Sequence, residues 1–482
     1  MSSKFAGALV FFTSAAVLVL EILAGRLLAP YAGVTLETFT AIIGVVLGGI
    51  AFGTWLGGRY ADRTSAPVTL VGPVLILGGA LAASTVPLAR LLGPSMGTEG
   101  IAGLIALTAI SILPATAVLS ATPPIIVKII LDDLDRTGAT VGRISALGTA
   151  GALFGTFTSG FVLVATLPTS VTVLVVAVVT ALVGLGLWLR HRPESQVLSS
   201  VGLIGLVAGS ILTSAVQSPC DVETAYFCAS EIADPDNPDA SFLVLDTVTH
   251  AYVDKVEPTN LRFSSIRMFA SAIEAMTDGP VDALHVGGGG FSLPTWLTAT
   301  RPGSRNVVLE LDGALVDFVD ARLEPAPVER TIVGDARVSL TRAGGGFDVV
   351  VGDAFGGLAV PWHLTTVEFL GEIFASLTED GLYVMNLIDH GAFEFLRAEV
   401  ATASSVFPET ALVTVPERFE IGGNFMLVAS KQPIQADRIV AAAAALDLEV
   451  VVLTGGALEA FVDGAAPLTD DFAPVDQLLA TS

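Results

Sequence analysis

Long uncharged runs of apolar residues constrain the fold of this chain more than any other feature. Residues 41–51 and 171–187 contain no Asp, Glu, Lys or Arg. Stretches of about 20 apolar residues match the hydrocarbon core of a bilayer, which a helix of that length spans. Hydropathy and Gly/Pro breaks predict about seven helices, over 5–28, 38–56, 68–88, 101–120, 144–166, 169–189 and 198–216. We therefore predict a multi-pass α-helical membrane domain over residues 1–216.

The charge distribution separates this part from the rest of the chain. Residues 1–216 contain 8 acidic and 10 basic residues, whereas 217–482 contain 39 acidic and 13 basic ones, and the whole chain has a net charge of −24. A chain of 482 residues also exceeds the size of one hydrophobic core. The second part is therefore predicted to be a separate domain, over 217–482. Its negative field makes nucleic acid an unfavourable partner.

Lysine occurs 4 times in the chain and arginine 19 times. With the acidity of the second domain, this bias favours adaptation to high salt, where screening shortens the reach of charge repulsion. Full stability in low salt, measured as an unfolding curve, would exclude this hypothesis.

Basic residues fall on alternate predicted loops of the helical domain. They are Lys4, then Arg59 and Arg63, then Lys128, Arg136 and Arg143, then Arg190 and Arg192. By the positive-inside rule these loops lie in the cytoplasm. An odd number of spans then sends the second domain outside, and one missed or false span reverses this prediction. We predict a location in the cell membrane, with the C-terminal domain on the extracytoplasmic side.

The two cysteines, Cys220 and Cys228, lie eight residues apart just after the last predicted span. Such a pair can close a disulfide in an oxidising compartment. The alternative is two reduced thiols packed apart in a cytosolic domain. Taken with the loop charges, the pair favours the outside location.

Few polar features interrupt the predicted helices. The first helix carries Glu21 and Arg26, which either pair inside the bundle or extend toward the bilayer surface. This helix is too long for a signal peptide and further spans follow it, so we expect it to be retained. Gly151 and Gly155 are four residues apart in a span rich in small residues, and this spacing predicts close helix packing.

After residue 281 the pattern changes to short β-rich runs separated by helical stretches. The runs are DALHV, NVVLELD, RTIVGD, FDVVVGD, GLYVMNLI, ALVTV and NFMLVAS, between 282 and 430. Strands alternating with helices predict a largely parallel sheet with helices on both faces. Ligands of such sheets bind at the carboxyl ends of the strands.

Polar residues follow four of these strands. Gly287, Gly288, Gly289 and Gly290 follow the first strand, Glu310 ends the second, Asp335 the third and Asp353 the fourth. Glycines let a backbone approach a ligand, and an acid after the second strand can accept both hydroxyls of a ribose. Each acid alone reads better as a helix cap or a solvated carboxylate. Polar features at the ends of four strands, along one edge of the sheet, together favour a nucleotide-type site.

The loop after Asp353 carries a further candidate. His363 either faces the pocket or packs against the protein. Thr365 and Glu368, three residues apart, are typical of a capping box that opens a helix.

At these residues the chain resembles the spermidine synthase family of aminopropyltransferases, over about 221–430. It resembles the membrane-fused, spermidine-synthase-like relatives of that family over nearly its whole length. The matching motifs are LVLDTVTHAYVD, HVGGGG, LELD, GDA and DVVVGDAFGG, and LTDDFAPVDQL near the C-terminus. The resemblance implies a methyltransferase-like, Rossmann-like α/β domain with a small N-terminal β element at about 240–256. It also implies decarboxylated S-adenosylmethionine, or a related nucleoside, as the donor.

The resemblance also implies roles for individual residues. Glu310 would hold the donor ribose, Asp335 the adenine, and Asp353 would remove a proton from the attacking amine. The matching motifs further add Ala336 to the donor site, and His250 and Tyr252 to the substrate site. No metal site is expected, because the five histidines do not cluster with cysteine at ligand spacing.

Three departures from the family pattern concern the acceptor. Gly356 stands where the family carries a second acid, His250 stands where a glutamine is usual, and Ser265 with Arg267 replaces a stretch with tyrosine and glutamate. Replacing acids by arginine disfavours a diamine, because like charges repel. We therefore expect an acceptor other than putrescine.

Three functions stay open. The first is a membrane-bound group transferase of aminopropyltransferase type that acts on a small molecule. The second is an extracytoplasmic transferase that acts on a lipid or a lipid-anchored surface protein, with Asp353 and His363 as the working groups. The third is a non-catalytic membrane scaffold or sensor. In each case the lipid bilayer is a partner, and a homodimer is considered as the assembly.

Overall fold

The computed structural model describes residues 1–97, 100–131, 137–191, 197–357 and 359–480. They form two compact units, Met1–Ser230 with Leu245–Val248 and Glu231–Val244 with Thr249–Ser482. Residues 217–230, which follow the last long helix, thus belong to the helical unit. Arg136 and Arg192, two of the basic loop residues, lie outside the described residues.

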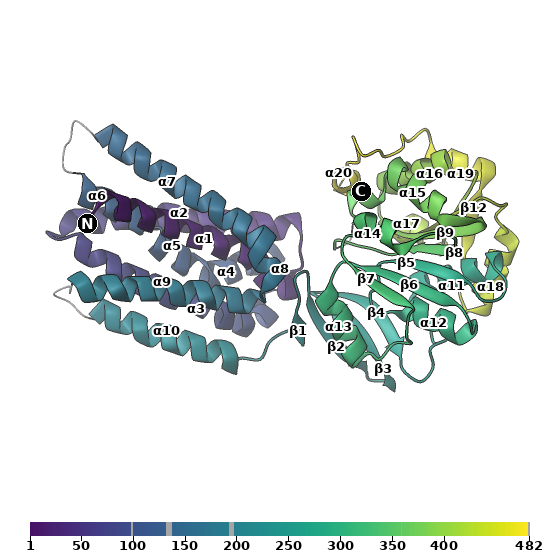
Figure 1. Cartoon of the computed structure of the whole chain (residues 1–482), viewed down its shortest axis with the longest axis horizontal. Coiled ribbons are helices and arrows are strands. Elements are labelled where there is room, and N and C mark those ends of the chain that lie inside the picture. The colour runs from purple at the N-terminus through teal and green to yellow at the C-terminus, as the bar shows by residue number, and fades with distance from the viewer. Residues whose placement is uncertain (98–99, 132–136, 192–196, 358, 481–482) are drawn as a thin grey trace. The chain divides into compact units, whose positions relative to one another are not determined.

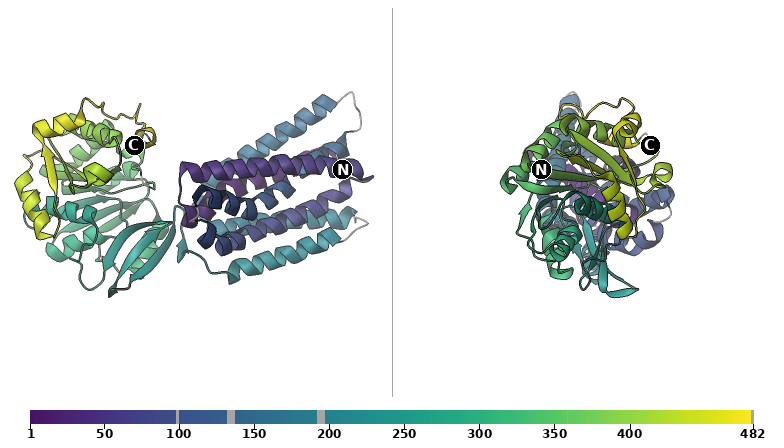
Figure 2. Two further views of the ribbon diagram at one scale, coloured as in Figure 1. Left: turned by 180° about the vertical axis from the view of Figure 1, so that it is seen from behind. Right: turned by 90° about the vertical axis from the view of Figure 1, so that its right-hand side faces the viewer.

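The first unit is a bundle of helices that lie alongside one another (Figures 1 and 2). In the described residues six helices are long and apolar enough to cross a membrane, against about seven predicted. They are Ser3–Ala32 (α1), Leu36–Arg63 (α2), Val68–Met96 (α3), Leu113–Ile130, Thr137–Thr166 and Thr169–His191 (α9). Helix α10, Val197–Ala215, lies at the seventh predicted position.

The fourth predicted helix, 101–120, is wrong as a single element. The chain instead forms α4 (Gly100–Ser111), α5 (Leu113–Leu119) and α6 (Thr122–Ile130), with prolines in the first turns of α5 and α6. Proline cannot donate to the preceding turn, so helices restart at these positions. The fifth is α7 (Thr137–Thr158), followed by a π-helical turn, Ser159–Leu163, and α8 (Val164–Thr166).

Close packing at the predicted glycines is confirmed. A Cβ atom added to Gly151 or Gly155 would overlap the backbone of Phe11 or Ala15 on α1. The absence of side chains at these positions therefore lets α7 approach α1.

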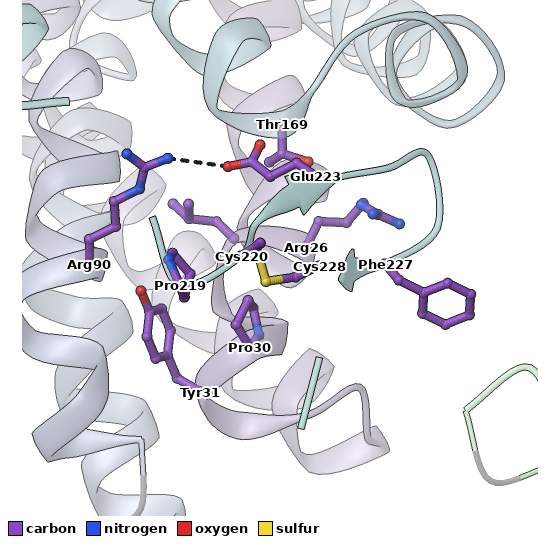
Figure 3. Close-up of a pocket in the computed structure, with 11 residues that line it drawn as sticks. Arg26, Pro30, Tyr31, Arg90, Thr169, Pro219, Cys220, Glu223, Phe227 and Cys228 are labelled. Carbon is purple, nitrogen blue, oxygen red and sulfur yellow. Dashed lines mark hydrogen bonds and ion pairs between the residues drawn. A yellow bond between two sulfur atoms is a disulfide. The ribbon is translucent and has the colours of Figure 1, made fainter. Parts of the chain in front are cut away.

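A disulfide closes the segment after α10 on itself, and polar contacts hold this segment at the helix ends (Figure 3). Cys220 and Cys228 form the disulfide, with Cα atoms 5.2 Å apart. Arg90 of α3 pairs with Glu223 at 3.2 Å, and the other oxygen of Glu223 accepts hydrogen bonds from the amide and hydroxyl of Ser170, both 3.0 Å. The Arg90 side chain is only 9% exposed, so the pair is shielded from water. Arg26 donates to the Thr224 carbonyl at 3.1 Å.

This segment contains the first strand of a small four-stranded sheet. Its order is β1 (Val222–Glu223), β2 (Cys228–Asp234), β3 (Asn237–Leu245) and β4 (Val248–Asp254). The β element predicted at 240–256 covers only its last two strands, because the acidic and polar residues of β2 hide its alternation.

The second unit contains an eight-stranded sheet in the order β12-β10-β11-β9-β8-β5-β6-β7. Strands β5 to β9 pair in parallel, and β10, β11 and β12 pair antiparallel. The predicted largely parallel sheet is confirmed. The bounds are β5 Asp282–Val286, β6 Arg305–Glu310, β7 Arg330–Val333, β8 Phe347–Gly352, β9 Leu377–Asp389, β10 Glu409–Thr414, β11 Gly423–Ser430 and β12 Val451–Thr454.

Helices cover both faces of this sheet (Figure 1). Helices α11 (Ser264–Met276), α12 (Ser292–Thr300) and α18 (Ala436–Ala445) pack on one hydrophobic core. Helices α14 (Ala336–Ala343), α15 (Val367–Ser376), α16 (Glu394–Val406) and α19 (Gly455–Val462) pack on the other. The remaining helices are α13 (Gly313–Arg322), α17 (Arg418–Ile421) and α20 (Val475–Ala480). The strand order reverses between β5 and β8, and a crevice for a ligand is expected outside their carboxyl ends.

The capping box predicted at Thr365 and Glu368 is wrong. Thr366 caps α15, and its hydroxyl accepts from the Phe369 amide at 3.3 Å. The Thr365 hydroxyl instead donates to the Trp362 carbonyl at 2.7 Å, and Glu368 accepts from the Asp470 amide at 3.0 Å.

Candidate functional site

The glycine loop joins β5 to α12 at the reversal of strand order. Gly287 has φ +98° and Gly289 has φ +50°, in the left-handed region that disfavours side chains. A Cβ atom at Gly287 would overlap the carbonyl oxygen of Asp353, and one at Gly290 would lie 2.6 Å from the Ala251 Cβ. Glycine is therefore required at both positions, because the chain after β8 lies close to Gly287 and strand β4 lies close to Gly290.

Glu310 ends β6 next to this loop. It is 9% exposed, and its carboxylate accepts from the amides of Gly288 at 2.8 Å and Asp312 at 3.0 Å. Burial raises the pKa of Glu310, and the hydrogen bonds from these amides oppose the rise. The carboxylate thus lies within reach of the glycine loop, where ligand hydroxyls could bind it.

Asp353 follows β8, and its backbone amide donates to the Val286 carbonyl at 2.8 Å. Its side chain accepts from the Asn386 amide at 2.9 Å, and Asn386 accepts from Asn424 at 3.0 Å. Burial raises the pKa of Asp353 to about 6, although the Asn386 hydrogen bond lowers it. A carboxylate with this pKa can act as a base near neutral pH. Neither asparagine was predicted from the sequence. Asn386 could have been identified, because it is a polar residue within the apolar run of β9.

Asp335 and His363 pair with each other. Asp335 caps α14 through the Val338 amide at 3.1 Å, and its second oxygen lies 2.9 Å from His363 Nε2. Arg337 donates to the His363 carbonyl at 3.2 Å and makes two bonds to Asp470, at 2.6 and 2.7 Å. The C-terminal LTDDF motif therefore holds the short helix Trp362–Leu364 in place.

A pocket brings together only part of the predicted site. It is lined by His250, Ala251, Ile266, His285, Gly287, Gly288, Gly289, Gly290, Ser292, Leu293, Pro294, Val351 and Asp353. In the described part of the chain, Glu310, Asp335, Ala336 and His363 are not among its lining residues. Asp353 and the glycine loop thus share the pocket, whereas the Asp335–His363 pair does not line it.

Tyr252 also lies away from the pocket lining. Its hydroxyl donates to Asp234 at 3.0 Å, and the Arg262 guanidinium stacks on its ring at 5.3 Å. Its carbonyl accepts a hydrogen bond at 2.9 Å from the hydroxyl of Ser292, which lines the pocket.

His285 is a pocket residue that the sequence reading missed, because it stands inside the apolar strand DALHV. It is 2% exposed, and its Nε2 lies 2.9 Å from the Asn306 side-chain oxygen. Burial lowers its pKa to about 4, and burial also lowers the pKa of His250. Both imidazoles are therefore neutral at pH 7.

Arg267 and Gly356, two of the residues that depart from the family pattern, do not line the pocket in the described part of the chain. Arg267 donates to the Leu261 carbonyl at 2.6 Å, and its neighbour Ile266 is the residue of α11 that lines the pocket. Gly356 is exposed and pairs with Ala359 in an isolated bridge. Among the residues that the structure describes, no group of three or more His, Cys, Asp or Glu could hold a metal ion.

Comparison with known proteins gives one curated relative and several solved structures. A polyamine aminopropyltransferase of Vibrio vulnificus (strain CMCP6) is 32% identical over 222 residues, 41% of this chain and 70% of the relative. A structure described as a probable spermidine synthase from Corynebacterium glutamicum ATCC 13032 has a TM-score of 0.48 at 25% identity, covering 52% of this chain and 95% of that one. A spermidine synthase in complex with the transition state analogue AdoDATO has a TM-score of 0.34 at 17% identity, covering 54% and 90%. No protein-family model matches the chain.

Proposed function

Since this chain belongs to the spermidine synthase family of polyamine aminopropyltransferases, we propose that it is a membrane-bound group transferase with Asp353 as its base. The observation that carries this proposal is the position of Asp353, in one pocket with the glycine loop and with a pKa raised to about 6. The six long apolar helices support attachment to a membrane.

The proposed donor is a nucleoside sulfonium such as decarboxylated S-adenosylmethionine. The acceptor nitrogen attacks the carbon bonded to the sulfonium sulfur, so that a C–N bond forms while the C–S bond breaks and a neutral thioether leaves. The acceptor's proton passes to the Asp353 carboxylate. Such a displacement needs little beyond deprotonation and in-line positioning. Glu310 and the glycine loop would hold the ribose.

Binding of the thioether 5′-methylthioadenosine to the purified full-length protein tests the donor site. We expect Glu310→Gln to weaken this binding by about 10- to 100-fold, because hydrogen bonds to a charged group contribute about 1.5–3 kcal/mol. Isothermal titration calorimetry measures the affinity. The matched control is Asp278→Asn, since the Asp278 side chain is 96% exposed. Equal affinities for wild type and Glu310→Gln would remove Glu310 from the donor site.

A second candidate is a transferase that acts outside the cytoplasm on a lipid headgroup or a lipid-anchored surface protein. The Cys220–Cys228 disulfide supports it, because disulfides persist in oxidising compartments. The basic loop residues, which include Arg59, Arg63 and Arg190, also support it through the positive-inside rule. In this reading the acceptor is delivered by the membrane.

Labelling of Cys220 and Cys228 in intact cells with a membrane-impermeant maleimide separates the two candidates. Labelling that appears only after an impermeant reductant is expected if the disulfide lies outside. Labelling only after lysis, with no need for reductant, would put the domain in the cytoplasm and contradict the second candidate. A Cys220→Ser/Cys228→Ser double variant controls for background.

A further inference from the structure

The pocket around Asp353 carries little charge. Of the described residues that line it, Asp353 is the one carboxylate, and none is a lysine or arginine. Gly290 and the exposed Gly356 add no acid to this region. A diamine brings two positive charges, and a buried charge without a partner is costly. The pocket can therefore match one amine, and a second ammonium group would have no carboxylate partner among these lining residues.

The hydrogen bonds of Asn306 determine the tautomer of His285. The Asn306 amide nitrogen donates to the Thr298 hydroxyl oxygen at 3.2 Å and to the Pro294 carbonyl at 3.4 Å. Its oxygen is therefore the group that faces His285 Nε2, and it can only accept. The proton of the neutral imidazole must lie on Nε2, which leaves Nδ1 as an acceptor.

His285 and Asp353 project from the same face of the sheet. His285 on β5 is paired with Val351 on β8, and Asp353 follows Val351 by two residues, about 7 Å along the strand. Within the described part of the chain, the Asn306 contact is the one side-chain hydrogen bond of His285. The remaining lining is largely apolar and includes Ile266, Leu293 and Val351. The pocket thus offers the Asp353 carboxylate and the neutral His285 imidazole as acceptors, together with the polar side chains of His250 and Ser292, beside an apolar wall.

We propose that His285 is a specificity-determining residue that positions the acceptor, through a hydrogen bond from the acceptor's reacting amine or hydroxyl group to Nδ1. The acceptor is then a compound with a single amine or hydroxyl on an apolar body, not a diamine or polyamine. This inference rests on the proposed transferase function, and it names the substrate class of the same site.

Amine binding to the full-length protein saturated with 5′-methylthioadenosine tests the inference. The probes are 1-aminobutane and 1,4-diaminobutane at equal ionic strength. We expect the monoamine to bind at least about tenfold more tightly than the diamine. His285→Leu should weaken binding of the monoamine by about tenfold, because the bond to Nδ1 is lost. His285→Asn should keep the wild-type affinity, because the asparagine oxygen can occupy the position of Nδ1. Asn306→Asp is a further variant. Its carboxylate favours a protonated imidazole, which makes Nδ1 a donor and should also weaken binding of the monoamine.

The melting midpoint and the nucleoside affinity of each variant separate positioning from folding. Both should match wild type in His285→Asn, and the nucleoside affinity should be unchanged in Asn306→Asp. Equal affinity for the two amines in the wild type, or unchanged monoamine affinity in His285→Leu and Asn306→Asp, would overturn the inference and leave the transferase proposal standing. Absence of nucleoside binding in the wild type would overturn both.

Discussion

Asp353→Asn is expected to lower the rate of group transfer by about 10²- to 10⁴-fold, the usual contribution of a general base. The substitution keeps the shape of the side chain, and its oxygen can still accept from Asn386. Nucleoside affinity and melting midpoint should therefore stay near wild type. Transfer is measured by mass spectrometry of the thioether product, with monoamines as acceptors. Full activity in Asp353→Asn would exclude Asp353 as the base.

The same experiment has a pH dependence. The pKa of Asp353 is about 6, so the wild-type rate should rise with pH through about 6 and level off above it. Asn386→Leu removes the hydrogen bond that lowers this pKa, and the profile should move to higher pH. A scaffold or sensor function predicts no transfer in the wild type at any pH.

Gly287→Ala is expected to abolish nucleoside binding, since a Cβ atom at this position would overlap the Asp353 carbonyl. The strand end must then shift, and both the glycine loop and Asp353 move with it. The positive φ of +98° adds a backbone strain of about 1–3 kcal/mol. Calorimetry with 5′-methylthioadenosine and thermal unfolding of the full-length protein measure the two effects.

Gly344→Ala is the matched control. Gly344 follows α14 with φ +97°, and a Cβ atom there would meet nothing within 4 Å. It should lose only the stability that the backbone strain costs, and it should keep nucleoside affinity. If both variants bind the nucleoside equally, the close contact between Gly287 and Asp353 has no role in the site.

The strands of the sheet were predictable because each is a short apolar run that ends in a polar residue. The prediction of DALHV matches β5 residue for residue, and Asp353 was expected where β8 ends. Strand β12 was missed, because its partner β10 lies more than 30 residues earlier and only this pairing defines it. The break between α4 and α5, inside the predicted helix 101–120, was missed because the apolar run continues across Pro114, and α6 was not predicted.

Side-chain partners in the site were not predictable in the same way. Strand position indicates where Asp335 and Asp353 lie along the sheet, but not which neighbour each side chain contacts. The pairing of Asp335 with His363 and the contact of His285 with Asn306 join residues 28 and 21 positions apart. Such contacts depend on helix packing and loop paths, which a single sequence does not reveal.

The bond between Glu223 and Arg90 affects where the chain can be cut to obtain the α/β part without the long helices. A fragment that starts at residue 217 would retain Glu223 but lose Arg90 and Ser170, leaving a carboxylate without its three hydrogen bonds. A fragment that starts at residue 231 would remove β1 and the first residues of β2, and it would expose the edge of β3. Each cut therefore leaves polar groups without their hydrogen-bond partners. A fragment of residues 217–482 would therefore require a new partner for Glu223, or its replacement by an uncharged residue.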